Sequence, residues 1–187
     1  DATVTKQYPI VIWNIIDGKR TIVKSIDTSK VGEYQLMYIH KDSSGNQALD
    51  KNNSTHNYLY RYVHVVDTTS PSITLNGDAD MTIEAGSKFV DPGVTAKDIV
   101  DGNTKVVTTG SVNTQKPGTY TLTYTTTDSH NNTSSVTRTI HVIDTTAPVI
   151  TLNGKSSVIV ELGSTYNDAS ATARDIVDGN VKVNVVE

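Results

Sequence analysis

The chain has 187 residues, a formal net charge of −4 and a hydrophobic fraction of 36%. Its mildly acidic charge, without a basic cluster, excludes the electrostatic footprint of a nucleic-acid-binding protein, and no apolar run approaches the ~20 residues that a membrane-spanning helix needs. It contains no cysteine, which excludes disulfide bonds, thiolate catalysis and cysteine-bound zinc. The low hydrophobic fraction favours several small cores over one large core.

The N-terminal segment, about residues 1–67, is predicted to be a diverged copy of the segment that follows it. VGEYQLMYIHKDSSGN, from Val31, parallels PGTYTLTYTTTDSHNN, from Pro117. IIDG, from Ile15, parallels IVDG, from Ile99. Because the opening part of the later copy has no counterpart here, we expect this segment to be a repeat that lacks its first strands.

The middle segment, 68–144, alternates apolar and polar residues along its length. Tyr120, Leu122 and Tyr124 alternate with threonines, for example, and a hairpin turn follows at Asp128. A period of two residues predicts β-strands. Seven or so short strands with closely spaced turns and no helical period predict a complete immunoglobulin-like β-sandwich. A closed barrel is the main alternative fold.

The C-terminal segment, 145–187, repeats the beginning of the middle segment. DTTSPSITLNG starts at Asp67 and DTTAPVITLNG at Asp144, an offset of 77 residues (144 − 67). AKDIVDGN and ARDIVDGN follow at the same offset, but this copy stops before the strand that begins GTY in the middle segment. The sequence therefore predicts an all-β chain of tandem repeats of about 77 residues, one complete and two partial.

The repeated unit resembles the bacterial Ig-like domain of pesticidal crystal proteins, surface adhesins and secreted hydrolases. The residues that carry the resemblance are DTT-[SA]-P-x-I-T-L-N-G, E-x-G, A-[KR]-D-I-V-D-G, G-T-Y-T-L-T-Y-x-x-x-D and R-T-I-H-V-x-D. The match covers essentially all of 68–187, and 15–67 with insertions. The resemblance implies an Ig-like fold, whereas modules of this kind serve as stalks, adhesins and enzyme appendages alike.

No catalytic site is predicted in this chain. HExxH, GxSxG, Walker and GxGxxG sequences are absent. His64 and His141 occupy equivalent positions in two copies, which favours a structural or solvent-facing role over metal ligation. The paired carboxylates also recur in each copy, whereas a catalytic pair would occur once. We therefore predict that the chain is not an enzyme.

Acidic turns at the ends of the repeats are the candidate metal sites. In a sandwich of this type, the turn after the second strand and the hairpin between the last two strands lie at the end where the linker enters. Carboxylates there would suit Ca²⁺, which takes 6–8 oxygen ligands. The alternative is that each aspartate only accepts hydrogen bonds from its own turn. The candidate calcium ligands are Asp67, Asp98, Asp101 and Asp128 at the first junction, and Asp144, Asp175 and Asp178 at the second.

The first repeat carries two insertions that are rich in aromatic residues. The candidate ligand-binding residues there are Tyr8, Trp13, Tyr58 and Tyr60, which have no counterparts in the other copies. Aromatic side chains on loops at one end of a sandwich form a recognition surface for glycans or proteins. The alternative is that they repair a local core or pack against a neighbouring repeat.

The partial repeats raise the question of self-association. A sandwich without its first strand exposes an unpaired edge. The tail holds early strands and the head holds late strands, so two chains might complete one domain by strand complementation. The alternative is that this segment belongs to a longer array, in which neighbouring repeats complete both ends.

The predicted function is that of a spacer, stalk or adhesive array in an extracellular, surface-attached or secreted bacterial protein. One alternative is a ligand- or receptor-binding module, such as an adhesin tip or toxin, that contacts a host or cell-surface protein or glycan through the first repeat. A second alternative is an accessory domain of a secreted glycan hydrolase. Calcium is the one cofactor that the residues suggest.

Overall fold

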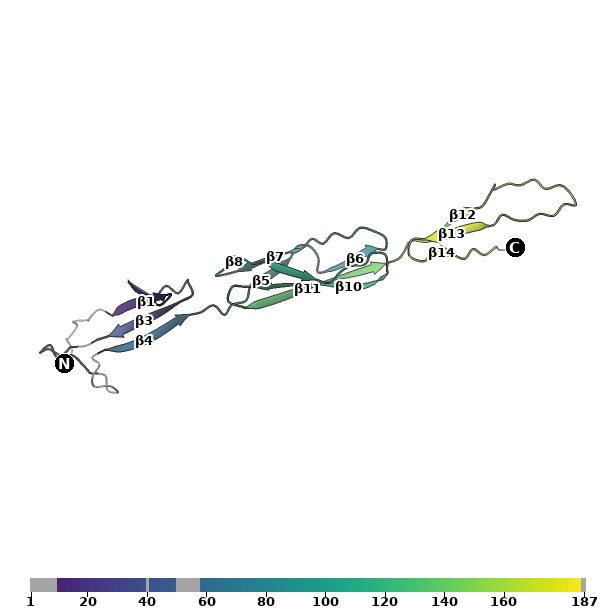
Figure 1. Cartoon of the computed structure of the whole chain (residues 1–187). Helices are drawn as coiled ribbons and strands as arrows, with labels where there is room; N and C mark the ends of the chain where they lie inside the picture. Colours follow the sequence, from purple (N-terminus) through teal and green to yellow (C-terminus); the bar gives the residue numbers. More distant parts are fainter. Residues whose placement is uncertain (1–9, 40, 50–57, 186–187) are drawn as a thin grey trace. The chain divides into compact units, whose positions relative to one another are not determined.

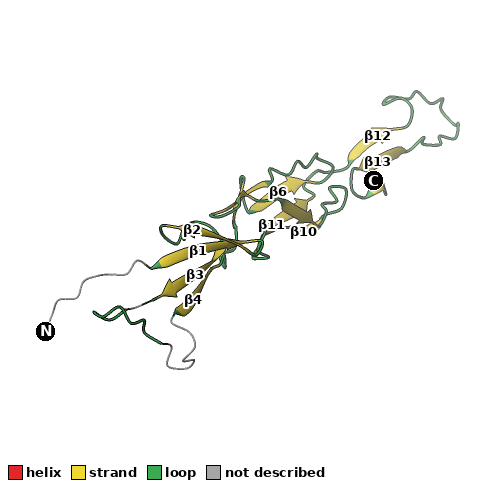
Figure 2. Cartoon of the chain, turned by 60° about the vertical axis from the view of Figure 1, so that its left-hand side comes forward, coloured by secondary structure: helices red, strands yellow, loops and turns green. Residues whose placement is uncertain are grey.

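The computed structural model describes residues 10–39, 41–49 and 58–185. The chain divides into two units, Asp1–Thr69 and Ser70–Glu187, and Figure 1 labels most of their strands. The described residues form strands and loops and no helix (Figure 2), so the predicted all-β class is confirmed. No helix among them is long and apolar enough to cross a membrane.

The first unit contains a single antiparallel sheet of order β2-β1-β3-β4. Its strands are β1 (Val11–Ile16), β2 (Lys19–Val23), β3 (Gly32–Tyr38) and β4 (Leu59–Val65). Asp17 and Gly18, with φ of 50° and 74°, form the two-residue turn between β1 and β2, which is the hairpin geometry that matches strand twist. Tyr34 of β3 is buried.

The second repeat forms two sheets from the seven strands between residues 72 and 143. One sheet has the order β5-β7-β8, with β5 (Ser72–Leu75), β7 (Val94–Asp98) and β8 (Gly102–Asn103). The other has the order β6-β11-β10-β9, with β6 (Asp80–Glu84), β9 (Val106–Thr109), β10 (Gly118–Thr127) and β11 (Thr133–Ile143). β6 runs parallel to β11, whereas the other pairs are antiparallel.

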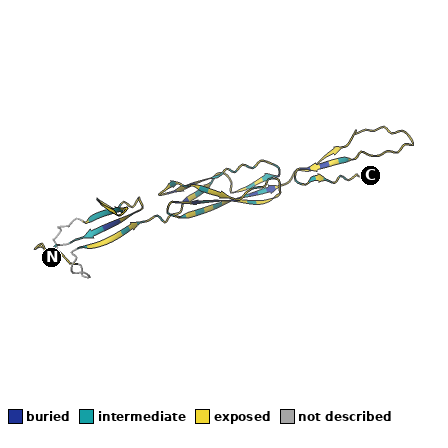
Figure 3. Cartoon of the chain, in the orientation of Figure 1, coloured by how far each residue is buried: buried dark blue, intermediate teal, exposed yellow. Residues whose placement is uncertain are grey.

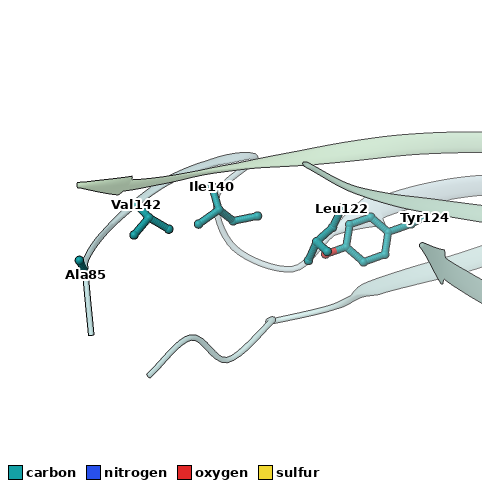
Figure 4. Packing of buried hydrophobic residues seen from close by; sticks show 5 residues of the cluster. All are labelled: Ala85, Leu122, Tyr124, Ile140 and Val142. Atoms are coloured by element: carbon teal, nitrogen blue, oxygen red, sulfur yellow. The ribbon is translucent and has the colours of Figure 1, made fainter. Parts of the chain in front are cut away.

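The core of the second repeat lies between these two sheets. Alternation along β10 and β11 directs every second side chain inward, and the buried cluster is Ala85, Leu122, Tyr124, Ile140 and Val142 (Figure 4). Leu75 and Val94, from the opposite sheet, pack against this cluster. Because side chains of both sheets share one core, the predicted Ig-like sandwich is confirmed for this repeat.

A buried arginine connects the strands of this core. Arg138 of β11 has no solvent exposure. Its Nε donates to the Asp78 carbonyl at 3.0 Å, its Nη2 donates to the Asn76 carbonyl at 2.6 Å, and its Nη1 forms an ion pair with Asp91. The guanidinium thus ties β11 to the loops on both sides of β6.

The tyrosine beside this arginine completes the network. Tyr124 donates its hydroxyl hydrogen to Asp91 Oδ1 at 2.7 Å, and burial together with this carboxylate raises the pKa of Tyr124 to about 12. Burial alone would raise the pKa of Asp91, but hydrogen bonds from Tyr124 and Gly93 and the charge of Arg138 outweigh it and lower that pKa. The buried charges are therefore paired and hydrogen-bonded.

The third repeat contains the sheet β12-β13-β14. Its strands are β12 (Val149–Leu152), β13 (Ala171–Asp175) and β14 (Gly179–Val181), which begin 77 residues after β5, β7 and β8. Residues 157–161, which correspond to β6, form no strand, because the chain holds no counterpart of β11 to pair with them. Figure 3 shows this repeat as largely exposed. The domain boundaries after residues 67 and 144 stay predictions.

Replacement of Arg138 tests the buried network. Arg138→Ala leaves Asp91 and several carbonyls buried without their donor, so the free energy of unfolding of the second unit should fall by about 3–5 kcal/mol. Arg61→Ala is the matched control, since Arg61 lies 5.7 Å from the Tyr38 ring as Arg138 does from Tyr124, yet is exposed.

The two units can be followed separately in urea titrations. Trp13, the one tryptophan of the chain, reports the first unit by fluorescence, whereas circular dichroism reports both units. Arg138→Ala should shift only the transition that fluorescence does not detect. A loss below about 1 kcal/mol, equal to that of Arg61→Ala, would contradict a central role for Arg138.

Candidate functional site

The end of the second repeat that carries the β7–β8 turn gathers acidic side chains, beginning with Asp98. Asp98 closes β7 and is 3% exposed. Its Oδ1 accepts hydrogen bonds from the backbone N–H groups of Val100, at 2.7 Å, and Asp101, at 3.0 Å. Its Oδ2 is also buried and has no hydrogen-bond partner among the described residues. An unsatisfied buried carboxylate oxygen is unfavourable.

Asp128 stabilises the β10–β11 hairpin at the same end and is 7% exposed. Its Oδ1 accepts from the backbone N–H groups of His130 and Asn132, both at 2.8 Å, and its Oδ2 accepts from Asn132 Nδ2 at 2.7 Å. Burial would raise the pKa of Asp128, but the hydrogen bonds from Asn132 and His130 outweigh it and lower that pKa. Asp128 is therefore held in its ionised form.

Asp101 joins the two turns. Its Oδ2 accepts from the backbone N–H of Ser129 at 2.6 Å, and its Oδ1 accepts from the Ser129 hydroxyl at 2.8 Å. These two hydrogen bonds, the backbone one first, lower the pKa of Asp101. The β7–β8 turn is thereby fixed against the β10–β11 hairpin by a bidentate contact.

The three carboxylates of the second repeat lie together as the topology of the sequence predicts. One oxygen of Asp98 and one of Asp128 are within 4.8 Å of each other, and so are ligand atoms of Asp101, Asp128 and His130. The structure therefore brings Asp98, Asp101 and Asp128 to one end of the sandwich. Metal binding by these residues stays a prediction.

Asp67 and Asp144 begin equivalent linkers and adopt the same turn. Asp67, in the first unit, accepts from the Thr69 N–H at 3.0 Å, and Asp144 accepts from the Thr146 N–H at 3.2 Å. Each carboxylate accepts an N–H two residues further on, as in an Asx turn. The predicted convergence of Asp67 with the acidic end of the second repeat stays a prediction.

The third repeat reproduces only one half of this arrangement. Asp175 is 6% exposed, and its Oδ1 accepts from the N–H groups of Val177, at 2.7 Å, and Asp178, at 3.0 Å. Its Oδ2 is buried without a hydrogen-bond partner in the described part of the chain, as in Asp98. Asp178 is exposed. No group of three metal-ligating side chains within the described residues includes Asp144, Asp175 or Asp178.

The first repeat has the hairpin but not the acidic turn. Asp42 accepts from Ser44, from the N–H of Asn46 and from its Nδ2 in the manner of Asp128. Asn14 stands where the other copies have Asp98 and Asp175, and it continues β1 rather than capping a turn. The connection between β1 and β2 is therefore a tight turn at Asp17-Gly18, in which Ile16 pairs with Lys19.

Two residues of the predicted aromatic site lie in strands, whereas the sequence predicted them on loops. Trp13 lies within β1 and Tyr60 within β4, not on loops, because β-branched apolar residues continue the strand up to Trp13. The Trp13 and Tyr60 rings meet edge to face at 6.4 Å, and the Tyr58 and Tyr60 rings lie 5.0 Å apart. Tyr8 lies outside the described residues.

These rings share one face of the sheet in the first unit. The strand register aligns Trp13 with Gln35 and Gln35 with Tyr62, and alternation places Tyr60 on the same side as Tyr62. Tyr60 and Tyr62 are exposed, whereas Trp13 is partly buried. We refer to Trp13, Tyr58, Tyr60 and Tyr62 as the aromatic face. It lies on the face opposite Tyr34 and covers Gln35, whose Nε2 donates to the Tyr62 hydroxyl at 2.8 Å.

The junction between the second and third repeats contains a contact that sequence reasoning did not assign. Glu84 Oε1 accepts from the Thr145 N–H and from the Thr146 hydroxyl, both at 2.8 Å, and Oε2 accepts from the Thr145 hydroxyl at 2.9 Å. The Thr145 N–H and the Thr146 hydroxyl contribute most to lowering the pKa of Glu84. Glu84 of β6 thus holds the linker that leaves β11.

Apolar packing accompanies this contact. Gly86 has a φ of +77°, and a Cβ there would lie 2.3 Å from Ile176 Cδ1 of the third repeat. Val177, in the same turn as Ile176, packs against the core of the second repeat. The signal in the sequence was the repeated E-x-G, at Glu84-Gly86, but nothing in it indicated that the partner is the linker 61 residues further on.

Acidification tests the turn contacts of Asp101 and Asp128. Their pKa values are lowered in the folded state, so their stabilisation is present above the unfolded-state pKa of about 3.9 and is lost as the pH falls through the folded values. The melting temperature should therefore decrease as the pH is lowered below about 4. Asp101→Asn should flatten this fall, whereas Asp178→Asn, at the exposed counterpart, should not. Parallel curves for wild type and Asp101→Asn would refute the contact.

Comparison with known proteins agrees with this architecture. Residues 73–142 match the model of the family described as the bacterial surface protein Ig-like domain. Hyalin from Strongylocentrotus purpuratus is 31% identical over 163 residues, which are 80% of this chain but 13% of hyalin. The chain therefore spans only a small part of that relative.

Two solved structures are similar in sequence to part of the chain. The lipoprotein BT2262 from Bacteroides thetaiotaomicron is 25% identical, with a TM-score of 0.38 over 55% of this chain and 54% of that one. A structure of CBM51-2 in complex with GlcNAc and INT domains from Clostridium perfringens ZmpB is 32% identical, with a TM-score of 0.33 over 46% of this chain and 21% of that one. By the family match, the second repeat of the chain is similar to bacterial surface Ig-like domains.

Proposed function

We propose that the chain is a non-catalytic spacer segment of an extracellular bacterial protein, surface-attached or secreted, in which ordered junctions hold successive repeats. The observation that carries this proposal is the junction between the second and third repeats. Glu84 accepts three hydrogen bonds from the linker, and Ile176 occupies the space above Gly86. A spacer transmits position only if its junctions resist bending, and both contacts do so.

The repeat chemistry supports the same role. Glu161 and Gly163 reproduce Glu84 and Gly86 at the 77-residue offset, so a following repeat could be held in the same way. The second repeat buries its own small core, and in a tandem array stability is a sum of repeat and nearest-neighbour contributions. The surface-protein family of the second repeat is consistent with an extracellular location.

Removal of the Glu84 carboxylate tests the ordered junction. In wild type the Thr145 amide is bonded to a carboxylate and should be protected from hydrogen exchange, and Glu84→Ala should speed its exchange on the order of tenfold or more. Glu161→Ala is the matched control, because Glu161 is exposed at the equivalent position. A Thr145 amide that exchanges at the unprotected rate in wild type would contradict the proposal.

A second candidate function is ligand binding by the aromatic face of the first unit. Three of its rings are in contact, and two of its tyrosines are exposed. Aromatic rings supply broad apolar contact at low entropic cost, which suits a glycan or a protein of the host or cell surface. The second repeat has Thr137 and Thr139 of β11 at the positions that correspond to Tyr60 and Tyr62, so the first repeat favours this role more than the second.

The single tryptophan makes this candidate testable. Titration with a panel of oligosaccharides should change Trp13 fluorescence in a saturable manner if the aromatic face binds glycans, and Tyr60→Ala should weaken the response at least tenfold. Tyr166→Ala, at an exposed tyrosine of the third repeat, should leave the response unchanged. A fluorescence that no glycan alters would count against glycan binding, and the spacer proposal would stand.

The remaining alternatives concern the protein around this chain. An accessory role beside a secreted glycan hydrolase, and membership of the pesticidal-crystal-protein type of Ig-like domain, both stay proposals. Either would leave this segment non-catalytic, with its chemistry confined to contacts between repeats and with ligands.

A further inference from the structure

We propose that the acidic end of the second repeat is a calcium site, with Asp98, Asp101 and Asp128 as its side-chain ligands. The proposal goes beyond the spacer function, because it assigns a bound ion to one end of one repeat. It rests on the unpartnered oxygen of Asp98 and on the carboxylates that surround it.

The buried carboxylate of Asp98 is incomplete without a further partner. Its Oδ1 accepts two backbone N–H groups, whereas its Oδ2 has no donor among the residues that the structure describes. The side chain is 3% exposed, so water does not reach this oxygen freely. A second buried carboxylate, that of Asp128, has an oxygen within 4.8 Å of one of Asp98. Two buried like charges this close repel each other, and a cation bound between them would remove that repulsion.

The spacing of the two carboxylates that flank Asp128 suits calcium ligation pair by pair. Oxygen ligands lie about 2.3–2.6 Å from Ca²⁺, so two ligands of the same ion are at most roughly 5 Å apart. The Asp98–Asp128 pair meets this limit, as does the Asp101–Asp128 pair. Carboxylate oxygens are the ligands that calcium prefers, and each carries two lone pairs, so oxygens that already accept an N–H keep one for the ion. Backbone carbonyls and water would complete the 6–8 ligands.

The positions of the ligands are fixed before any ion binds. Asp98 is fixed by the turn that it caps, and Asp128 by three hydrogen bonds within its hairpin. Asp101 is held by both donors of Ser129. A site whose ligands need no rearrangement loses less entropy when it binds, and the ion would join the β7–β8 turn to the β10–β11 hairpin.

The chain provides two natural comparisons. Asp175 has the same turn and the same unpartnered oxygen as Asp98, but the 187 residues hold no counterpart of Asp128 at the 77-residue offset. Asp42 has the hairpin of Asp128, but Asn14 replaces the buried carboxylate. The second repeat alone in this chain therefore combines both halves of the site.

The test uses the full chain after treatment with a chelator. Titration with CaCl₂ in a calorimeter should give saturable binding, and a hundredfold excess over Kd should raise the melting temperature of the second unit by on the order of 10 °C. Asp98→Asn should abolish this rise. Because asparagine keeps the oxygen that caps the turn, this variant should melt no lower than wild type when calcium is absent, which shows that it folds. Asp175→Asn should behave as wild type.

Three outcomes would overturn the calcium site. The first is a wild-type chain without binding heat or a shift in melting temperature at millimolar calcium. The second is an equal shift in Asp98→Asn, which would place the ion elsewhere. The third is an equal shift with NaCl at matched ionic strength, which would show that calcium only screens the acidic end.

Discussion

Arg138 is the residue on which the sandwich of the second repeat depends. Its guanidinium lies inside the core, where an unpaired charge is prohibitive, and it is accommodated because Asp91, Tyr124 and the backbone carbonyls of two loops surround it. The first strands of the repeat alternate between sheets, since β5 pairs with β7 while β6 pairs with β11. By binding the segments on both sides of β6, Arg138 fixes this change of sheet. The position of Glu84, and with it the junction, follows from that placement.

The three copies show that equivalent residues have different structural roles, depending on which partners lie next to them. Residues 80–84 form β6 because β11 offers an edge, whereas residues 157–161 form no strand in this chain. Asp98 and Asp175 cap the same turn, yet among the described residues Asp98 belongs to a group of potential metal ligands and Asp175 does not. Asn14, at the same position, leaves the first repeat with a tight hairpin in place of the capped turn. The repeats therefore share their strand pattern but differ in the turns at their ends.

Much of this architecture is predictable from the sequence, because strand alternation and the 77-residue period are local signals. They predicted the strands of the second repeat and the approach of Asp98 to Asp128. The aromatic site was predicted on loops, whereas Trp13 and Tyr60 lie in strands, because insertions relative to another copy need not be loops. Glu84 and Arg138 show what pattern reasoning misses. Both are charged residues whose partners are far along the chain, Thr145 for one and Asp91 for the other, and nothing in composition or periodicity indicates which distant groups meet.

The proposed spacer role requires that the contacts among Glu84, Gly86, Thr145 and Ile176 hold the second and third repeats in a fixed relative orientation. Residual dipolar couplings in a weakly aligned sample measure this directly, because each repeat reports its own orientation and amplitude of motion. For a spacer of this kind, couplings from β5–β11 and from β12–β14 should fit a single alignment tensor of one magnitude. Two tensors of different magnitude would show that the repeats reorient independently, and would contradict it.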